Sequence, residues 1–326
     1  MGPGSVDGLE PGQSPEAISP PPPRRHVPTI TLVLCGVCII LFVAIAARGG
    51  QQSWDSLATW GYLPPQRVWD GAYWGLVSSA FIHLALWHVA FNVYWLWVLG
   101  GPVERTLGPL SYFGLVLASA LVSSSVQLGI SGSTGHGASG VVYALFGLMW
   151  ASRRHVPAFA QALGERTAPL FWIWLVGCIF ATQAGVAEVG NGAHVGGLVL
   201  GLLAAHWLIL RTAHRALAMV GTGLLVALSL VPLFSSPWSS TWVGYSAHKA
   251  HLAGDYDTAI ARYRRSIALG GDRLWALENL AFAYHSKGAE SEYTATLAEI
   301  RAADADTAAK VEAEVSGSPD TGAEKP

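Results

Sequence analysis

The stretch of sequence that decides the fold is SGSTGHGASGVVYALFGLMWASRR, residues 131–154. Its apolar part, 139–151, predicts a helix about 20 Å long, because an α-helix rises about 1.5 Å per residue. The hydrocarbon core of a bilayer is about 30 Å thick, so this helix is too short to cross it. The Gly- and Ser-rich residues 131–137 must then dip into the membrane. Irregular backbone at that depth needs protein or water to satisfy its polar groups, so the stretch predicts a water-filled cavity inside the bilayer.

The composition is typical of a membrane protein. Of the 326 residues, 52% are hydrophobic and only 12% are charged, a balance that water-soluble domains rarely show. The formal net charge of -2 argues against nucleic acid as a partner, because phosphate recognition needs a basic surface. Apolar stretches, compared with the roughly 20 residues needed to cross a bilayer, predict seven helices in the membrane, of which the fourth is the short one: 29–47, 84–101, 110–130, 139–151, 169–187, 193–210 and 217–235. We therefore expect an all-α fold, a polytopic membrane helical bundle that crosses the cell membrane several times.

Basic residues mark one side of the membrane. Arg24 and Arg25 precede the first span, and Arg153 and Arg154 follow the fourth. Because cytoplasmic loops carry an excess of Lys and Arg, we expect a cytoplasmic N-terminus. Seven spans then place the C-terminal part outside the cytoplasm. The aromatic segment 48–83, between the first two spans, is expected to lie in the outer interface.

The C-terminal part predicts a small helical-repeat domain. Two similar segments include Gly254 and Gly288, and the spacing of 34 residues from one glycine to the other is the tetratricopeptide period. Helical repeats form concave binding surfaces, so a protein adaptor is an expected partner of this domain. The composition divides the whole chain into a disordered, Pro-rich cytoplasmic tail, a membrane domain, the repeat domain and a disordered C-terminal tail, at residues 1–28, 29–236, 244–303 and 304–326.

Ser139 is the candidate nucleophile. It begins the short helix at the floor of the predicted cavity, inside the small-residue run Gly137-Ala138-Ser139-Gly140, which leaves room for a substrate backbone. A serine hydroxyl needs a base to take its proton. His194, in the sixth span, lies within about one helical turn of the same depth when each residue is counted from the Arg that follows its span. Tyr143 lies one turn from Ser139 on the same helix face and is placed to stack on the His194 ring.

His88 and Asn92 form a polar pair on the second span. They are four residues apart and so share one helix face, at a depth where polar side chains usually have a function. Both donate hydrogen bonds, so we assign them to the oxyanion site together with the backbone N–H of Ser139. No carboxylate lies in the outer half of a catalytic span, which favours a Ser-His dyad, and no metal or cofactor is expected. Gly140 and Gly197 support the site by leaving the facing helices flat enough to pack closely.

Simpler interpretations stay open for single residues. A serine in a Gly-rich turn is usually a helix cap, and His88 with Asn92 can serve only to bridge helices. His83 and His136 are interpreted as interfacial or structural. A metal site built from His83, His88 and His136 is a minor alternative, because no carboxylate or thiolate joins them.

Four motifs together resemble those of rhomboid proteases, especially bacterial ones. They are His88-x-x-x-Asn92, Glu104-Arg105-x-Leu107-Gly108, Gly137-Ala138-Ser139-Gly140-Val141-Val142-Tyr143-Ala144 and Asn191-Gly192-Ala193-His194-Val195-Gly196-Gly197, within residues 69–210. The resemblance implies a six-helix rhomboid core and a serine endopeptidase that cleaves transmembrane protein substrates near the outer membrane face. It implies Ser139 as nucleophile, His194 as base, and His88 and Asn92 as oxyanion donors. The seventh span and the repeats look like the subgroup with an added C-terminal helix and a tetratricopeptide domain.

A second function class stays open beside proteolysis. A non-catalytic, rhomboid-like binding or quality-control protein would hold membrane helices in the same lateral cavity. A retained nucleophile and base disfavour it. A small-solute transporter is disfavoured because the chain lacks paired interrupted helices in matching halves.

Overall fold

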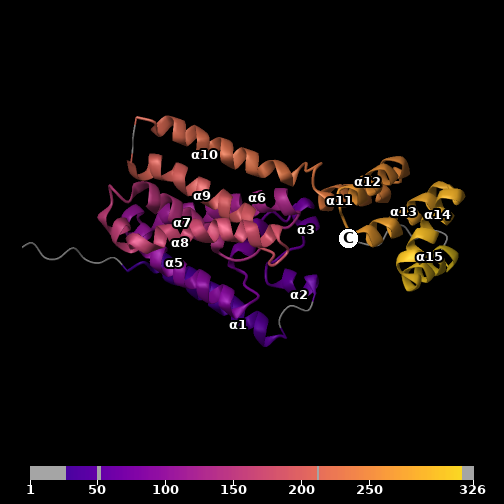
Figure 1. Ribbon diagram of the computed structural model, residues 1–326, viewed down its shortest axis with the longest axis horizontal. Helices are drawn as coiled ribbons and strands as arrows, with labels where there is room; N and C mark the ends of the chain where they lie inside the picture. The colour runs from indigo at the N-terminus through magenta and orange to yellow at the C-terminus, as the bar shows by residue number, and fades with distance from the viewer. Residues whose placement is uncertain (1–26, 50–52, 211–212, 318–326) are drawn as a thin grey trace, which may run out of the picture.

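The computed structural model describes residues 27–49, 53–210 and 213–317, and all regular elements within them are helices. A long bundle fills one part of the molecule, and a second group of helices lies at one end of it (Figure 1). The main helices of the bundle are α1 (Thr29–Ala47), α5 (Leu86–Leu107), α6 (Pro109–Ser131), α7 (Ser139–Ser152), α8 (Pro157–Gln183), α9 (Asn191–Ala205) and α10 (Arg215–Leu230). The predicted tail 1–28 lies almost wholly outside the described residues.

The described helices have the length and composition of membrane spans. Five are long and apolar enough to cross a bilayer: α1, α6, α8, α9 with the π-turn η2 (His206–Leu210), and α10 with the short helix η3 (Val231–Leu233). A sixth candidate is α5 joined to the short segment before it, with a bend of 98° between them. The predicted all-α polytopic bundle is therefore confirmed, and the protein is a multi-pass membrane protein.

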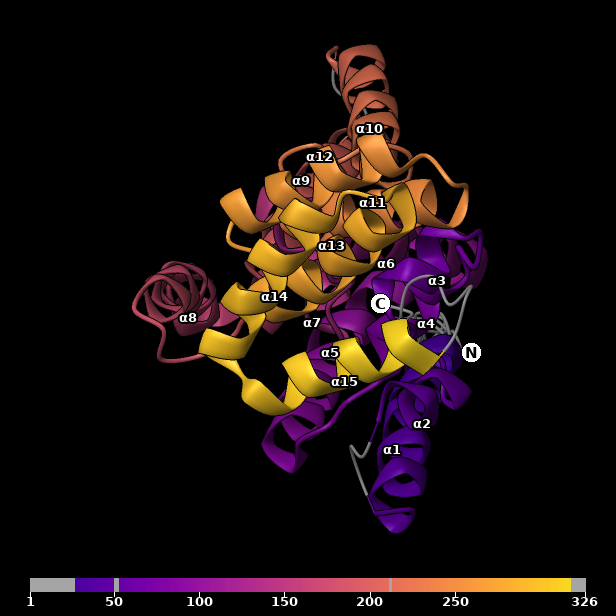
Figure 2. The same ribbon diagram turned by 90° about the vertical axis from the view of Figure 1, so that its right-hand side faces the viewer.

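The short helix α7 lies in the middle of the bundle. It begins at Ser139, and its residues from Gly140 to Met149 are buried. By contrast, only 22% of the most apolar stretch of α8 is buried, and the same share of that of α10, against 61% for α6. Figure 2 accordingly shows α1, α8 and α10 at the edges of the bundle. Because α7 is buried, other helices surround its N-terminal end, where Ser139 lies.

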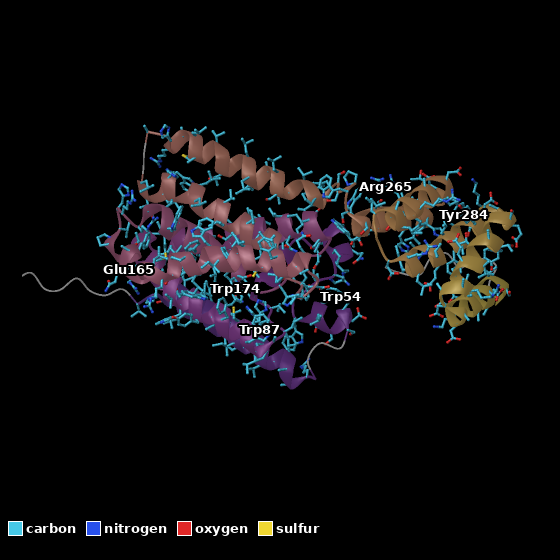
Figure 3. The ribbon with its side chains drawn as sticks, viewed as in Figure 1. Trp54, Trp87, Glu165, Trp174, Arg265 and Tyr284 are labelled. Carbon is cyan, nitrogen blue, oxygen red and sulfur yellow. The ribbon has the colours of Figure 1, made fainter. Side chains whose placement is uncertain are left out.

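Helix α8 differs from the predicted span 169–187. It begins at Pro157 and changes direction at Gly164, whose φ is 52°. The part of α8 before residue 169 was not predicted, because it contains charged residues such as Glu165 and the prediction rested on the length of apolar stretches alone. Figure 3 places Glu165 at one end of the bundle and Trp54 at the other.

In its described part, the segment between α1 and α5 contains four short helices. They are α2 (Trp54–Thr59), α3 (Pro65–Trp69), α4 (Gly75–Ser78) and η1 (Ser79–Phe81). Trp54 and Trp74 are exposed, whereas Trp69 is buried. This segment therefore packs against the bundle through some of its aromatic residues and leaves others outside.

A buried carboxylate holds the start of α1. Glu104, on α5, accepts hydrogen bonds from the backbone N–H of Ile30 at 2.9 Å and of Thr31 at 2.8 Å. The Thr31 hydroxyl donates a third bond to it, at 2.7 Å. A negative charge at a helix N-terminus is favourable, because the first N–H groups of a helix have no helical acceptor.

Replacing Glu104 with glutamine should destabilise the bundle. The amide has the same shape as the carboxylate, but only one of its ends is an oxygen that accepts hydrogen bonds, and the other end is a donor that faces donors. The free energy of unfolding should therefore decrease by about 2 kcal/mol or more. Denaturant unfolding in detergent micelles measures the change. The matched control is Glu165→Gln, because Glu165 is exposed. Equal stability of the two variants would contradict the capping role.

The C-terminal helices form two hairpins and a last single helix. They are α11 (Ser240–Leu252), α12 (Tyr256–Ala268), α13 (Arg273–Lys287), α14 (Glu290–Ala303) and α15 (Ala305–Gly317). Gly254 and Gly288, 34 positions apart in the chain, turn the two hairpins with φ of 77° and 76°. These helices bury their own hydrophobic core, separate from that of the bundle.

The predicted disorder of residues 304–326 is wrong for its first part. Residues 305–317 form α15, because Ala308 and Val311 are buried in the core of the C-terminal helices. Arg301 and Glu312 add an ion pair at 2.6 Å. Small alanines and scattered charges hid this helix from a reading of composition. Residues 318–326 lie outside the described residues, and the domain begins at Ser240 rather than at 244.

Acid should destabilise the C-terminal helices through His251. This side chain is only 3% exposed and lies 3.5 Å from the Tyr263 hydroxyl. Burial, and then the neighbouring His248, lower the pKa of His251 to about 4. As the pH falls below 6.5, His251 binds a proton in the unfolded chain, whereas in the folded domain it stays neutral down to about pH 4. The free energy of unfolding therefore decreases between pH 6.5 and pH 4.

We expect the unfolding temperature of these helices to drop by about 5 °C or more between pH 7.5 and pH 5. Hydrogen exchange of α11 and α13 during heating follows their unfolding. The variant His251→Gln should lose most of this dependence, whereas His285→Gln should keep it, because His285 is exposed. An unchanged pH dependence in His251→Gln would contradict the assignment.

Candidate active site

A cavity of about 720 Å³ opens among α5, α6, α7, α8 and α9. Its wall includes the loop between α6 and α7, which the sequence placed inside the membrane. Every predicted site residue except Gly197 lines it: His88, Asn92, Gly137, Ser139, Gly140, Tyr143 and His194. Gly197 lies just behind, against Gly140.

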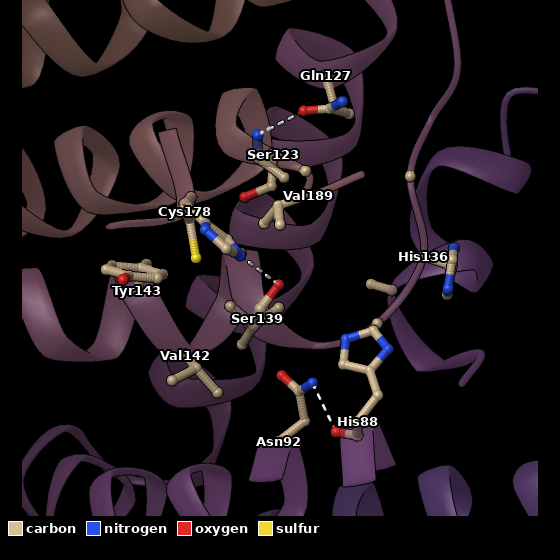
Figure 4. A pocket seen from close by; sticks show the side chains of 18 of the residues that line it. His88, Asn92, Ser123, Gln127, His136, Ser139, Val142, Tyr143, Cys178 and Val189 are labelled. Carbon is tan, nitrogen blue, oxygen red and sulfur yellow. Dashed lines mark hydrogen bonds between the residues drawn. The ribbon is translucent and has the colours of Figure 1, made fainter. Parts of the chain in front are cut away.

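Ser139 and His194 meet at the floor of this cavity. Ser139 Oγ lies 2.9 Å from His194 Nε2 (Figure 4). The His194 ring is 4% exposed and stacks near the ring of Tyr143, with centroids 4.7 Å apart and an angle of 32°. Within the described part of the chain, His194 Nδ1 has no hydrogen-bond partner. The arrangement is a hydroxyl and an imidazole in contact, without a carboxylate to orient the ring.

The first turn of α7 leaves donors beside Ser139. The first helical bond runs from Val142 N–H to Ala138 O, at 2.9 Å. The N–H groups of Ser139, Gly140 and Val141 therefore have no acceptor within the helix. They are available to a negatively charged oxygen close to the serine.

Two hydrogen bonds fix the loop that leads to Ser139. Gly137 N–H donates to Ser79 O at 3.1 Å, and Ala138 N–H donates to His83 Nε2 at 3.3 Å. Gly137 has φ of 97°, and a Cβ there would lie 2.6 Å from a ring carbon of His88. Only glycine fits on both counts. The sequence treated His83 as interfacial or structural, and it gave no signal that this ring holds the backbone next to Ser139.

His88 and Asn92 lie together on one side of Ser139 (Figure 4). Asn92 Nδ2 donates to the backbone oxygen of His88, at 2.9 Å. An asparagine amide carries two N–H groups, so one remains for a ligand in the cavity. The spacing of these residues correctly placed both side chains in one cavity, and their role as oxyanion donors stays a prediction.

Three histidine rings lie close together at the cavity. The ring of His88 lies 5.0 Å from that of His83 and 5.5 Å from that of His136. His83 already uses both nitrogens, since Nδ1 faces Phe81 O at 3.2 Å and Nε2 accepts from Ala138. The described residues contain no group of three or more side chains suited to a metal ion.

The facing helices α7 and α9 touch through their backbones. A Cβ on Gly197 would lie 2.0 Å from Gly140 O, and one on Gly140 would lie 2.5 Å from Ser123 Oγ. Gln127, also on α6, accepts a hydrogen bond from Ala193 N–H at 3.2 Å and so fixes the start of α9 next to His194. The sequence did not predict a role for Ser123 or Gln127 at the site, because no pattern within α6 indicates that these two side chains face it.

A comparison with known protein families finds a match over this same region. Residues 70–212 match the model of the rhomboid domain. This region is similar to the rhomboid family. It extends from just before α4 to the end of η2, and it contains Ser139 and His194, whereas α1, α10 and the C-terminal helices lie outside it.

Two curated relatives of the chain are both named as rhomboid proteases. The chain is 37% identical over 193 residues to the rhomboid protease GlpG of Serratia proteamaculans (strain 568). The aligned part makes up 59% of this chain and 66% of the relative. It is 34% identical over 184 residues to the rhomboid protease GlpG of Yersinia pseudotuberculosis serotype I (strain IP32953), over 56% of this chain and 64% of the relative. The chain thus spans slightly less than two thirds of the length of these relatives.

Proposed function

We propose that the protein is an intramembrane serine endopeptidase that cleaves transmembrane substrate proteins near the outer membrane face. The contact of 2.9 Å between Ser139 Oγ and His194 Nε2, inside a cavity within the bundle, carries this proposal. The rhomboid domain and the protease name of its relatives support it. The alternative of a non-catalytic helix binder is not favoured, because a binder has no use for a paired nucleophile and base.

The geometry suits acyl transfer. Ser139 Oγ attacks the scissile carbonyl carbon while His194 Nε2 takes the hydroxyl proton. The free N–H groups at the start of α7, the second N–H of Asn92 and the His88 ring would hold the oxyanion. The C–N bond then breaks, and His194 gives its proton to the leaving amine. A water molecule repeats the attack on the acyl-enzyme and returns Ser139.

Substrates would enter from the lipid between α5 and α8. Phe91 and Trp174 close this side with ring centroids 5.3 Å apart, and both line the cavity. Figure 3 shows Trp174 and Trp87 between the two ends of the bundle. Helix α8 has five buried residues out of 27, against ten out of 22 in α5. We therefore propose that α8 moves when a transmembrane segment docks.

Reconstitution of the full chain in liposomes with a single-span substrate tests the proposal. We expect two product fragments, with the cut near the outer end of the substrate span. A fluorophosphonate probe, which reacts only with an activated serine, should add its mass to the peptide that contains Ser139. A folded protein that neither cleaves nor takes up the probe would refute the proposal.

Removal of the Asn92 amide should slow the chemical step. We expect Asn92→Ala to reduce kcat by about a hundredfold with little change in KM, as for the loss of one oxyanion donor in other serine hydrolases. Gln161→Ala, an exposed amide on α8, is the control and should keep full activity. A rise in KM at unchanged kcat would show that Asn92 binds substrate rather than its transition state.

We further propose that the N-terminus is cytoplasmic and that the C-terminal helices lie outside the cytoplasm. These helices lie at the end of the bundle opposite Glu165 (Figures 1 and 3). The basic residues Arg153, Arg154 and Arg166 belong to the same end as Glu165, and cytoplasmic loops carry an excess of such residues. We also propose that the two hairpins with turns at Gly254 and Gly288 are tetratricopeptide-like repeats that bind a protein adaptor. No cofactor or metal is part of the proposed reaction.

A further inference from the structure

The outer end of α6 separates the active-site cavity from the C-terminal helices. On one side, Ser123, Gln127 and Ser131 line the cavity. On the other side, Gly129 and Gly132 contact the segment that leads from α10 into α11. The last part of α6 is therefore shared by the cavity wall and by the base of the C-terminal domain.

The contacts on the second side are close. Trp238 Nε1 donates to Gly129 O at 2.7 Å. A Cβ on Gly129 would lie 2.6 Å from Pro232, and one on Gly132 would lie 2.4 Å from the Thr241 hydroxyl. Gly132 ends α6 with φ of 70°. No side chain larger than hydrogen fits at these two positions while the segment stays in place.

The segment before α4 holds the other side of the same connection. Trp69 Nε1 donates to Pro232 O at 3.1 Å, and its ring lies 5.1 Å from that of Tyr245. Asp70 accepts hydrogen bonds from the Tyr245 hydroxyl at 2.8 Å and from Lys249 at 3.2 Å. Figure 1 shows α3 and α11 next to each other at this end of the bundle. The start of α11 is therefore fixed on two sides.

The end of α6 continues directly into the loop that carries the nucleophile. Ser131 Oγ accepts from Ser133 N–H, and Ser133 Oγ accepts from Gly135 N–H at 3.2 Å. Gly137 and Ala138 are then held by Ser79 and His83, as described above. A shift of Gly132 would pass along this short, hydrogen-bonded loop to the backbone N–H of Ser139.

We propose that Trp238 and Thr241 are positioning residues for the catalytic loop, through which the C-terminal domain sets the geometry at Ser139. This inference rests on the proposed function. The two side chains touch no substrate. They keep Gly129 and Gly132 in place, so that the loop 132–138 presents the first turn of α7 in one conformation.

The test is the variant Trp238→Phe in the full chain, which keeps an aromatic ring and removes the N–H donor. We expect kcat for a single-span substrate and the rate of fluorophosphonate labelling each to fall about tenfold, with KM unchanged. Backbone amides of residues 132–138 should exchange hydrogen faster. The control is Trp74→Phe, because Trp74 is 56% exposed against 55% for Trp238 and its side chain makes no hydrogen bond to any of the described residues. It should leave all three quantities unchanged.

Each outcome decides the proposal. Unchanged exchange of the loop, or exchange equal in the two variants, would overturn it. A rise in KM alone would overturn it as well, because the domain would then dock substrate. A drop in unfolding temperature that accounts for the whole loss of activity would indicate a merely structural role. If wild-type protein neither cleaves nor is labelled, the proposed function fails, whereas loop exchange still tests the positioning contact.

Discussion

The variant His194→Ala should fold normally and lose at least a factor of about a thousand in cleavage rate. The reason is the contact of 2.9 Å between its Nε2 and Ser139 Oγ. Without the imidazole, no group in the described part of the cavity takes the hydroxyl proton at that distance. Ser139→Ala should lose as much, and the double variant should be no worse than either single one, because the two residues act as a unit.

Cleavage of a reconstituted single-span substrate and fluorophosphonate labelling measure this loss. His214→Ala is the matched control, since His214 is exposed near the start of α10. It should cleave at the wild-type rate. Cleavage by His194→Ala within tenfold of wild type would show that another base serves Ser139.

The second large effect is expected from Gly201→Ala, and it concerns stability. A Cβ on Gly201 would lie 2.0 Å from Ala144 O and 2.7 Å from the carbonyl carbon of Ala144. Both are backbone atoms of α7, so no side-chain rotation relieves the clash, and α7 has helices on all sides. Overpacking in a well-packed core typically costs about 1–3 kcal/mol, and we expect a value at or above the upper end.

Denaturant unfolding in micelles, read with the labelling rate of Ser139, tests this expectation. Gly114→Ala on α6 is the control, because a Cβ at Gly114 would meet nothing within 4 Å. The added methyl group should be harmless or slightly stabilising there, since alanine has the higher helix propensity. Equal stability of the two variants would show that α7 and α9 can move apart freely.

The sequence predicted the centre of the fold well because the determining quantities are local. The start of α7 at Ser139 follows from the length of one apolar run. The common depth of Ser139 and His194 follows from counting residues along two helices. The hairpin turns follow from the spacing of Gly254 and Gly288. None of these inferences needs knowledge of contacts between distant segments.

The parts that could not be predicted depend on such distant contacts. His83 holds Ala138 only because the segment before α5 folds back onto the bundle. Gln127 reaches Ala193 across the gap between α6 and α9. The helix α15 forms because other helices cover Ala308 and Val311, and its own residues show no strong apolar pattern. Single-residue properties contain no record of these pairings.

Helix α10 has a topological consequence for the whole chain. It runs back along α9, and in Figure 1 it joins the far end of the bundle to α11. A chain cut after Leu210 would present its carboxyl terminus on the face away from Ser139. Sixteen helical residues and η3 reverse that polarity. Whatever follows α10 in the chain therefore lies at the end of the bundle where α6 ends and the loop to Ser139 begins.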